Sequence, residues 1–105
     1  MIDFVFDEDE KNMTCVFSGH MDTILSTETA RIFEEKRESV GKICPEGLKI
    51  VFDLKSVDYI ASAFIRLCMA AAKSVDKGAF SIINTSPQVK KVFKVAGLEA
   101  IMNIS

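Results

Sequence analysis

The sequence has no tryptophan, and its 105 residues include one histidine, one tyrosine and two prolines. The single histidine, His20, argues against a zinc site, and we expect neither a metal nor another cofactor. No apolar run reaches the about 18 residues that span a bilayer. The start of the chain lacks the basic and apolar regions of a signal peptide. We therefore expect a cytoplasmic protein without membrane insertion.

Cysteine is also sparse, and Cys15, Cys44 and Cys68 form no CxxC motif. An odd number of cysteines at wide spacing indicates reduced thiols rather than a disulfide framework. Reduced thiols are typical of a reducing compartment, which agrees with the expected location.

An excess of basic charge is missing as well, because 13 basic and 15 acidic residues give a net charge of −2. Without that excess the chain is poorly suited to neutralise phosphates, so we do not expect nucleic acid as its partner. Hydrophobic residues make up 49% and charged residues 27%, which is a globular balance. The length predicts a single domain over residues 1–105.

Apolar periodicity predicts the elements of the first half. Ile2, Phe4 and Phe6 recur at every second position and predict a strand, which a turn connects to a second strand ending at Gly19. Helical spacing over residues 26–40 predicts an amphipathic helix, with Gly41 as its stop. Residues 48–54 are apolar enough for a central strand, and we expect residues 55–60 to form a loop.

The second half predicts two helices and one strand. The helix over residues 62–76 has its expected core stripe at Ile65, Cys68, Met69, Ala72 and Val75. A strand over residues 79–83 follows. Ser86 as N-cap and Pro87 at the first helical position predict the start of the last helix, and residues 98–104 form an apolar tail. The order is β-β-α-β-α-β-α, which predicts an α/β fold with a mixed, partly parallel sheet and helices mainly on one face.

Three stretches of the sequence stand in a recognisable order. Residues 48–69 contain the buried strand, then Val57-Asp58-Tyr59-Ile60, then a serine that opens an apolar helix. Residues 18–22 carry a Gly-x-x-Asp loop, and residues 84–98 the last strand, the third helix and a closing turn. In this order and spacing, over nearly the whole chain, the sequence resembles the STAS domain of bacterial anti-sigma factor antagonists.

The resemblance implies a phosphorylation switch. In switching members of the family the helix opens with Asp-Ser-Ser-Gly or Asp-Ser-Thr-Gly, and the first serine is phosphorylated by a partner kinase that is also the anti-sigma factor. The matching stretch here is Ala61-Ser62-Ala63-Phe64. Ser62 therefore matches the phosphoacceptor, whereas Ala61, Ala63 and Phe64 depart from the pattern.

Ser62 has two interpretations. A hydroxyl at a helix start, beside unpaired N–H groups and the positive end of the dipole, is accessible to a kinase. A phosphate there adds roughly −1.5 to −2 charges at pH 7, which a partner packed against the same spot cannot easily accept. Alternatively, Ser62 is an ordinary N-cap that contributes about 1 kcal/mol to helix stability.

Phe64 also has two interpretations. It lies one step off the expected core stripe, in line with Leu67 and Ala71, so it is either an exposed aromatic anchor for a partner or part of the core. In either case its bulk is able to shield Ser62 from a kinase.

The resemblance places a partner surface around Ser62. His20 and Asp22 lie in the loop that is near the phosphoacceptor in the family, although Asp22 is also suited to begin the first helix. We expect Asp58 to make a turn or a cap. The predicted partner-binding residues are Gly19, His20, Asp22, Asp58, Ala61, Ser62, Ala63, Phe64, Arg66 and Leu67.

Three classes of function follow from these residues. The first is an anti-sigma factor antagonist that binds an anti-sigma factor with serine/threonine kinase activity, frees its sigma factor and is switched at Ser62. The second is a constitutive scaffold or accessory subunit of a signalling or transporter complex. We do not expect an enzyme, because Ser62, His20 and Asp22 are the only candidate trio and no GxSxG or phosphate-binding glycine loop is present. The apolar tail or an exposed strand offers a surface for a homodimer.

Overall fold

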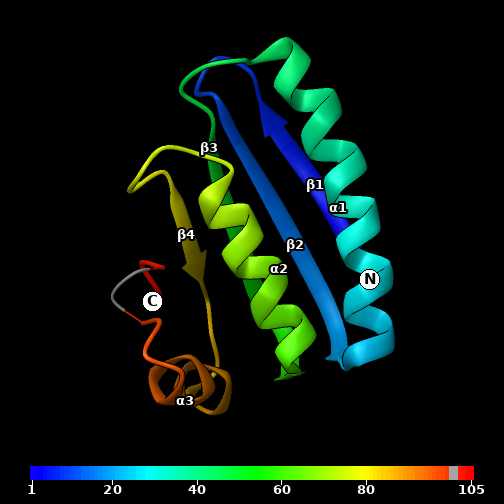
Figure 1. Ribbon diagram of the computed structural model, residues 1–105, viewed down its shortest axis with the longest axis vertical. Helices are drawn as coiled ribbons and strands as arrows, with labels where there is room; N and C mark the ends of the chain where they lie inside the picture. The colour runs from blue at the N-terminus through cyan, green and yellow to red at the C-terminus, as the bar shows by residue number, and fades with distance from the viewer. Residues whose placement is uncertain (100–101) are drawn as a thin grey trace.

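The computed structural model describes residues 1–99 and 102–105, and its element order is the predicted one. Figure 1 shows the elements, which are β1 (Ile2–Asp7), β2 (Asn12–Met21), α1 (Thr23–Ile43), β3 (Lys49–Ile60), α2 (Ser62–Lys73), β4 (Phe80–Ile83) and α3 (Pro87–Val95). The prediction of a β-β-α-β-α-β-α chain is confirmed. Within the described residues, none of the helices is both long and apolar enough to cross a bilayer.

The four strands form one sheet in the order β1-β2-β3-β4. β1 is antiparallel to β2, whereas β2, β3 and β4 run parallel to one another. Helices α1 and α2 cover the same face of the sheet, and α3 lies beyond the carboxyl end of β4 (Figure 1). The predicted mixed sheet, with helices mainly on one face, is confirmed.

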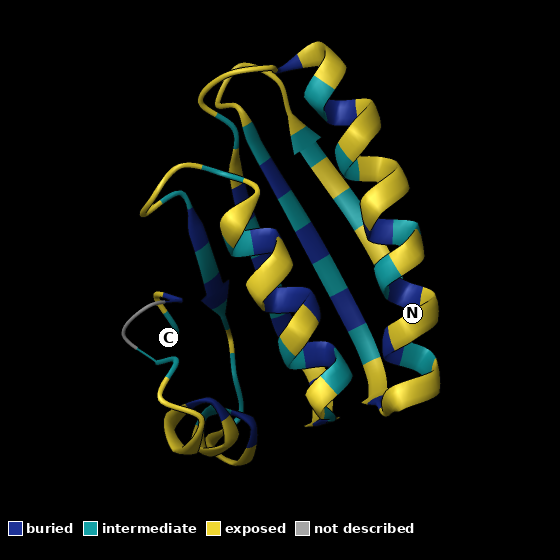
Figure 2. Ribbon diagram, viewed as in Figure 1, coloured by how far each residue is buried: buried dark blue, intermediate teal, exposed yellow. Residues whose placement is uncertain are grey.

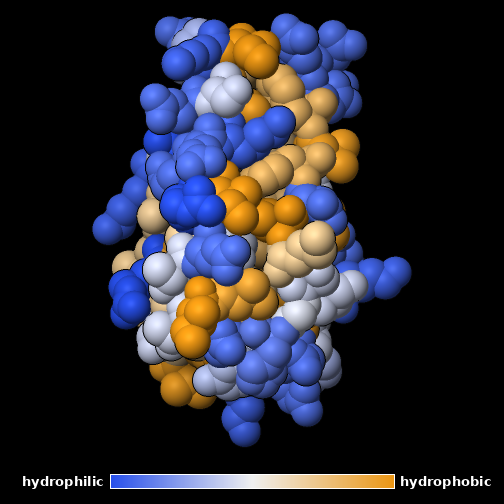
Figure 3. Space-filling model, turned by 90° about the vertical axis from the view of Figure 1, so that its right-hand side faces the viewer, coloured by the Kyte–Doolittle hydropathy of each residue, from blue (hydrophilic) through white to orange (hydrophobic). Residues whose placement is uncertain are grey.

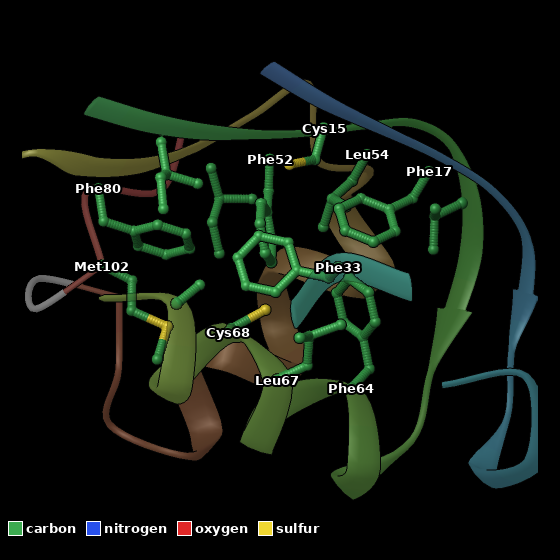
Figure 4. Packing of buried hydrophobic residues seen from close by; sticks show 14 of the residues in the cluster. Cys15, Phe17, Phe33, Phe52, Leu54, Phe64, Leu67, Cys68, Phe80 and Met102 are labelled. Carbon is green, nitrogen blue, oxygen red and sulfur yellow. The ribbon is translucent and has the colours of Figure 1, made fainter. Parts of the chain in front are cut away.

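The core fills the space between the sheet and the two covering helices. Burial alternates along β2, where Met13, Cys15 and Phe17 are buried and the residues between them are half-buried (Figure 2). The Phe52 ring lies at the centre, with its centroid 4.7, 5.0 and 5.5 Å from those of Phe17, Phe80 and Phe33 (Figure 4). Edge-to-face contacts of this kind add to the stabilisation from buried apolar area.

Helix α1 is longer than predicted at both ends. It begins after Asp22, and it passes through Gly41 to Ile43, so the prediction of Gly41 as its stop is wrong. Val40 and Cys44 are both buried, and the Cys44 N–H donates to the Val40 carbonyl at 2.8 Å. Burial of these two side chains outweighs the about 1 kcal/mol that a glycine costs inside a helix.

Strands β2 and β3 also extend beyond their predicted ends. β2 passes Gly19 and ends at Met21, and residues 55–60, predicted as a loop, form the second half of β3. The β2–β3 register shifts between Val16 and Ser18 and again between Gly19 and His20. These bulges interrupt the alternation of burial, so the sequence pattern no longer has the period of a strand.

The buried face of α2 differs from the predicted stripe. Phe64, Leu67, Cys68 and Ala71 are the buried residues of α2, while Met69 is 37% exposed and Ile65 only partly buried. Helix α2 ends at Lys73, three residues before the predicted end at Asp76. The helix is therefore rotated by about one residue position from the prediction, because the Phe64 ring packs against the aromatic cluster.

The C-terminal part of the chain returns to the sheet. Ser86 and Pro87 begin α3 as predicted, and the Ser86 hydroxyl accepts from the Val89 N–H at 3.2 Å. Of the predicted apolar tail, residues 100–101 lie outside the described residues. Met102 is 1% exposed and Ile104 forms a parallel bridge with Ile82, so these two residues pack within the chain.

We expect the central ring of the core to dominate stability. Phe52→Ala removes a fully buried ring and leaves a cavity, which lowers the free energy of unfolding by about 3–5 kcal/mol. Urea denaturation measures this change. Val95→Ala is the control, because the Val95 side chain is 80% exposed and its loss changes stability by less than about 0.5 kcal/mol. Equal effects of the two substitutions contradict this packing.

Candidate functional site

The starts of α1 and α2 lie at the same end of the molecule (Figure 1). Met21 pairs with Ile60 at the carboxyl ends of β2 and β3, and the Ala61 N–H donates to the Met21 carbonyl at 2.9 Å. The two loops of the predicted site are thus held side by side by a backbone hydrogen bond. Residues from both are available to a single ligand or partner.

Ser62 is the first residue of α2 and is exposed. The N-cap of α2 is Ala61, which supplies no side-chain hydrogen bond, so the interpretation of Ser62 as an ordinary N-cap is wrong. The first N–H groups of α2 therefore have no side-chain cap, and they favour a negative charge nearby. The hydroxyl of Ser62 lies at this electropositive start of the helix.

Phe64 and Leu67 belong to the core rather than to the surface. The Phe64 side chain is fully buried, and its ring meets the Phe17 ring edge-on with centroids 5.1 Å apart (Figure 4). Leu67 is 4% exposed. Neither side chain is able to contact a partner in this conformation, so we remove both from the predicted partner surface. Since Phe64 points into the core, it also leaves Ser62 exposed.

The outward face of α2 carries Ser62, Arg66 and Met69, all exposed. These positions are spaced by four and three residues, which places them on one face of a helix. Ala61 and Ala63, at the start of the helix, are half-buried. Met69 was predicted in the core, but it belongs to this surface.

His20, Asp58 and Tyr59 form a cluster on the paired ends of β2 and β3. The His20 and Tyr59 rings are stacked, with centroids 4.3 Å apart and planes 12° apart. His20 Nδ1 lies 3.4 Å from Asp58 Oδ1, and both side chains are mostly exposed. His20 and Asp58 were predicted in loops, but both lie in strands. The stacking gives this part of the surface a rigid, flat aromatic element.

Asp22 and Gly19 shape the backbone between β2 and α1. Asp22 Oδ1 accepts from the Leu25 N–H at 2.8 Å, so Asp22 is the N-cap of α1, one of the two roles considered for it. Gly19 has φ +108°, and a Cβ at this position would meet the Leu25 side chain at 3.4 Å. Any other residue at position 19 would therefore be strained, and Gly19 contributes its backbone conformation to the site and no side chain.

Two exposed apolar side chains of this region were not predicted as site residues. Tyr59 is 45% exposed and Ile24 is 80% exposed. The pairing of His20 with Tyr59 is not visible in the sequence, because residues 55–60 lack strand periodicity. Ile24 lies in the first turn of α1, which begins before the predicted helix start, and no motif marks it.

The candidate catalytic trio is not assembled in the described part of the chain. Asp22 caps α1 and His20 pairs with Asp58, so the candidate trio of Ser62, His20 and Asp22 is not a hydrogen-bonded relay. Burial raises the pKa of Cys15 to about 12, and burial also raises the pKa of Cys68. Both thiols thus stay protonated at neutral pH. Within residues 1–99 and 102–105, no group of three His, Cys, Asp or Glu is placed to hold a metal.

Comparison with known proteins agrees with this fold. The family model described as "STAS domain" matches residues 15–105, and the chain belongs to this family. None of the curated proteins compared matches the chain.

Three solved structures share the fold at low sequence identity. An anti-sigma-factor antagonist (STAS) domain protein from Planctomyces limnophilus has a TM-score of 0.78 at 18% identity, covering 99% of this chain and 87% of that one. An anti-sigma factor antagonist from Mycobacterium paratuberculosis has a TM-score of 0.72 at 18% identity, covering 99% and 85%. The anti-sigma factor antagonist SpoIIAA in its unphosphorylated form has a TM-score of 0.68 at 17% identity, covering 100% and 88%.

The uncapped start of α2 predicts a stabilising substitution. Ala61 has φ −92° and ψ 169°, the extended conformation of an N-cap. Ala61→Asp supplies the missing acceptor and raises the free energy of unfolding by about 0.5–2 kcal/mol, measured by urea denaturation. Asp22→Ala is the matched control at α1, with a loss of similar size. Unchanged or lower stability of Ala61→Asp contradicts the described start of α2.

Proposed function

We propose that the protein is an anti-sigma factor antagonist, a regulator of transcription that works in the bacterial cytoplasm. It binds an anti-sigma factor with serine/threonine kinase activity and frees the sigma factor, and phosphorylation of Ser62 ends the binding. The observation that carries this proposal is the exposed hydroxyl of Ser62 at the uncapped start of α2. Membership of the STAS family supports it, and the three free, buried cysteines agree with a reducing cytoplasm.

The position of Ser62 suits a switch that leaves the fold intact. A phosphate on Ser62 meets the unpaired N–H groups and the positive end of the α2 dipole, so the domain itself tolerates the added charge. A partner that covers the same hydroxyl would have to bury that charge without a counterion. The cost is several kcal/mol, which is about 10³-fold or more in affinity.

The proposed partner surface surrounds Ser62. From α2 it includes Arg66 and Met69, together with the backbone at Ala61 and Ala63. From the neighbouring segments it includes Gly19, His20, Asp22, Asp58, Tyr59 and Ile24. Tyr59, Ile24 and Met69 provide exposed apolar area in this group. Tyrosine and arginine, here Tyr59 and Arg66, are enriched among the residues that supply most of the binding energy of an interface.

A constitutive scaffold, bound to a signalling or transporter complex, is the second candidate function. The observation in its favour is the stretch Ala61-Ser62-Ala63-Phe64, which keeps the serine but has neither the Asp, the second hydroxyl residue nor the Gly of the switching members. A carboxylate at residue 61 is suited to orient the serine hydroxyl or contact a kinase, and alanine does neither. In this candidate function the same surface binds a partner without modification.

Phosphorylation is tested with the kinase directly. We expect that incubation with the cognate anti-sigma factor kinase and ATP increases the intact mass by one phosphoryl group. Peptide mapping then locates the group on Ser62, and Ser62→Ala abolishes the mass increase. A protein that binds the kinase but stays unmodified contradicts the switch and favours the scaffold. A protein that neither binds nor is modified contradicts the proposed function.

Binding is tested with a charge mimic. Ser62→Asp lowers the affinity for the kinase by about 10³-fold, measured by calorimetry, because the carboxylate is buried against the partner. The free energy of unfolding of the Ser62→Asp variant does not fall, since an acidic residue at the start of α2 is favourable. Ser39→Asp is the control, because Ser39 is exposed near the other end of α1. Equal affinities of the two variants contradict the switch.

A further inference from the structure

The outer edge of β1 is open. The Met1 nitrogen donates to the Ser18 carbonyl, and the Ser18 N–H donates to the Met1 carbonyl, both at 2.9 Å. In an antiparallel pair such hydrogen-bonded pairs alternate with pairs that are not bonded. The regular β1–β2 register therefore directs the N–H and C=O groups of Ile2, Phe4 and Phe6 away from β2. Among the described residues no strand pairs with this edge.

The opposite edge of the sheet is different. The Ser105 N–H donates to the Ile82 carbonyl at 2.9 Å, and Ile82 donates to the Asn103 carbonyl at 3.3 Å. The end of the described chain thus covers part of the β4 edge. The unpaired backbone groups of an exposed edge strand are able to pair with another chain. In the described sheet, β1 is the only edge strand whose outward backbone groups are unpaired along its whole length.

One face of β1 adds apolar surface to this edge. Ile2, Phe4 and Phe6 point to the side of the helices and are only partly buried, although they pack against the core. Figure 3 shows the side of the molecule that carries α1 and β1, where hydrophobic surface runs obliquely between two hydrophilic areas. The exposed Lys36 side chain places its ammonium 5.8 Å from the centre of the Phe4 ring.

The other face of β1 is acidic. Asp3 and Asp7 are exposed on either side of Val5, which is itself 62% exposed. The turn that follows adds three exposed acidic residues, Glu8, Asp9 and Glu10. A strand paired with β1 would therefore have apolar neighbours on the helix side and carboxylates on the other.

We propose that the β1 edge binds an extended segment of another protein in which Lys or Arg alternates with apolar residues. The segment adds to the sheet as a further strand through the free backbone groups of Ile2, Phe4 and Phe6. Its apolar side chains extend the hydrophobic surface beside α1. Its basic side chains lie next to Asp3 and Asp7, where cross-strand pairs of opposite charge are favourable.

A second copy of this chain is a poor occupant of the same edge. Pairing of β1 with β1 would place Asp3 and Asp7 of both copies on one face of a continuous sheet. Like charges across strands are destabilising, so the residues that attract a basic segment also oppose self-association. The edge lies on a different part of the chain from Ser62, and the inference does not depend on the proposed switch.

A synthetic peptide tests the proposal on the intact protein. The probe alternates Lys and Val and is capped at both ends, and a matched peptide alternates Glu and Val. We expect the Lys–Val peptide to shift the NMR signals of β1 and to slow hydrogen exchange at the amides of Ile2, Phe4 and Phe6. Binding weakens as salt is raised, because the charge pairs are exposed. The Glu–Val peptide leaves the spectrum unchanged.

Charge reversal provides the matched variants. Asp3→Lys with Asp7→Lys lowers the affinity for the Lys–Val peptide about tenfold or more, since two attractive neighbours become repulsive. Glu28→Lys with Asp76→Lys is the control, because both residues are exposed and the net charge changes equally. The control binds as the unmodified protein does.

Three results overturn the proposal. The first is that the Lys–Val peptide causes no change at β1, and the second is that the Glu–Val peptide binds equally well. The third is a concentration-dependent dimer in sedimentation, with the amides of Ile2, Phe4 and Phe6 protected in the dimer, which would assign the edge to a second copy. None of these results bears on phosphorylation of Ser62, so the two proposals fail separately.

Discussion

The parallel pairing of β2 with β3 determines where the helices begin and which residues meet at the surface. It continues past two register shifts to Met21 and Ile60, and the hydrogen bond from Ala61 to Met21 closes it. Each strand leads directly into a helix, so the pairing brings the starts of α1 and α2 together. Two parts of the chain that are distant in sequence thereby become one surface.

Phe64 fixes how that surface faces the solvent. Its ring packs against Phe17 and thereby joins the cluster around Phe52, so the first turn of α2 is held from the inside. With residue 64 directed inward, Ser62 lies on the exposed side of the same turn. The bulky residue that departs from the family pattern thus anchors the helix start, and it does not cover the hydroxyl.

Strong local signals made most of the fold predictable. Neighbouring residues alone predict three of these elements. They are the alternation of apolar residues in β1, the helical spacing in α1 and the Ser86-Pro87 start of α3. The second half of β3 was missed because bulges within β3 break its own period of two. The buried face of α2 is set by packing against the aromatic cluster, and the Tyr59–His20 stack is set by the pairing of β2 with β3. Both depend on contacts between distant parts of the chain, so local sequence patterns do not predict them.

Strands β2 and β3 stay paired to the point where the two helices begin. Hydrogen exchange at the Ala61 amide measures this directly, because its N–H donates across the strands to the Met21 carbonyl. We predict that this amide is strongly protected and exchanges only when a large part of the fold opens cooperatively. Exchange at the rate of an unstructured peptide would show that residues 55–60 are a loop, and the shared surface around Ser62 would then be lost.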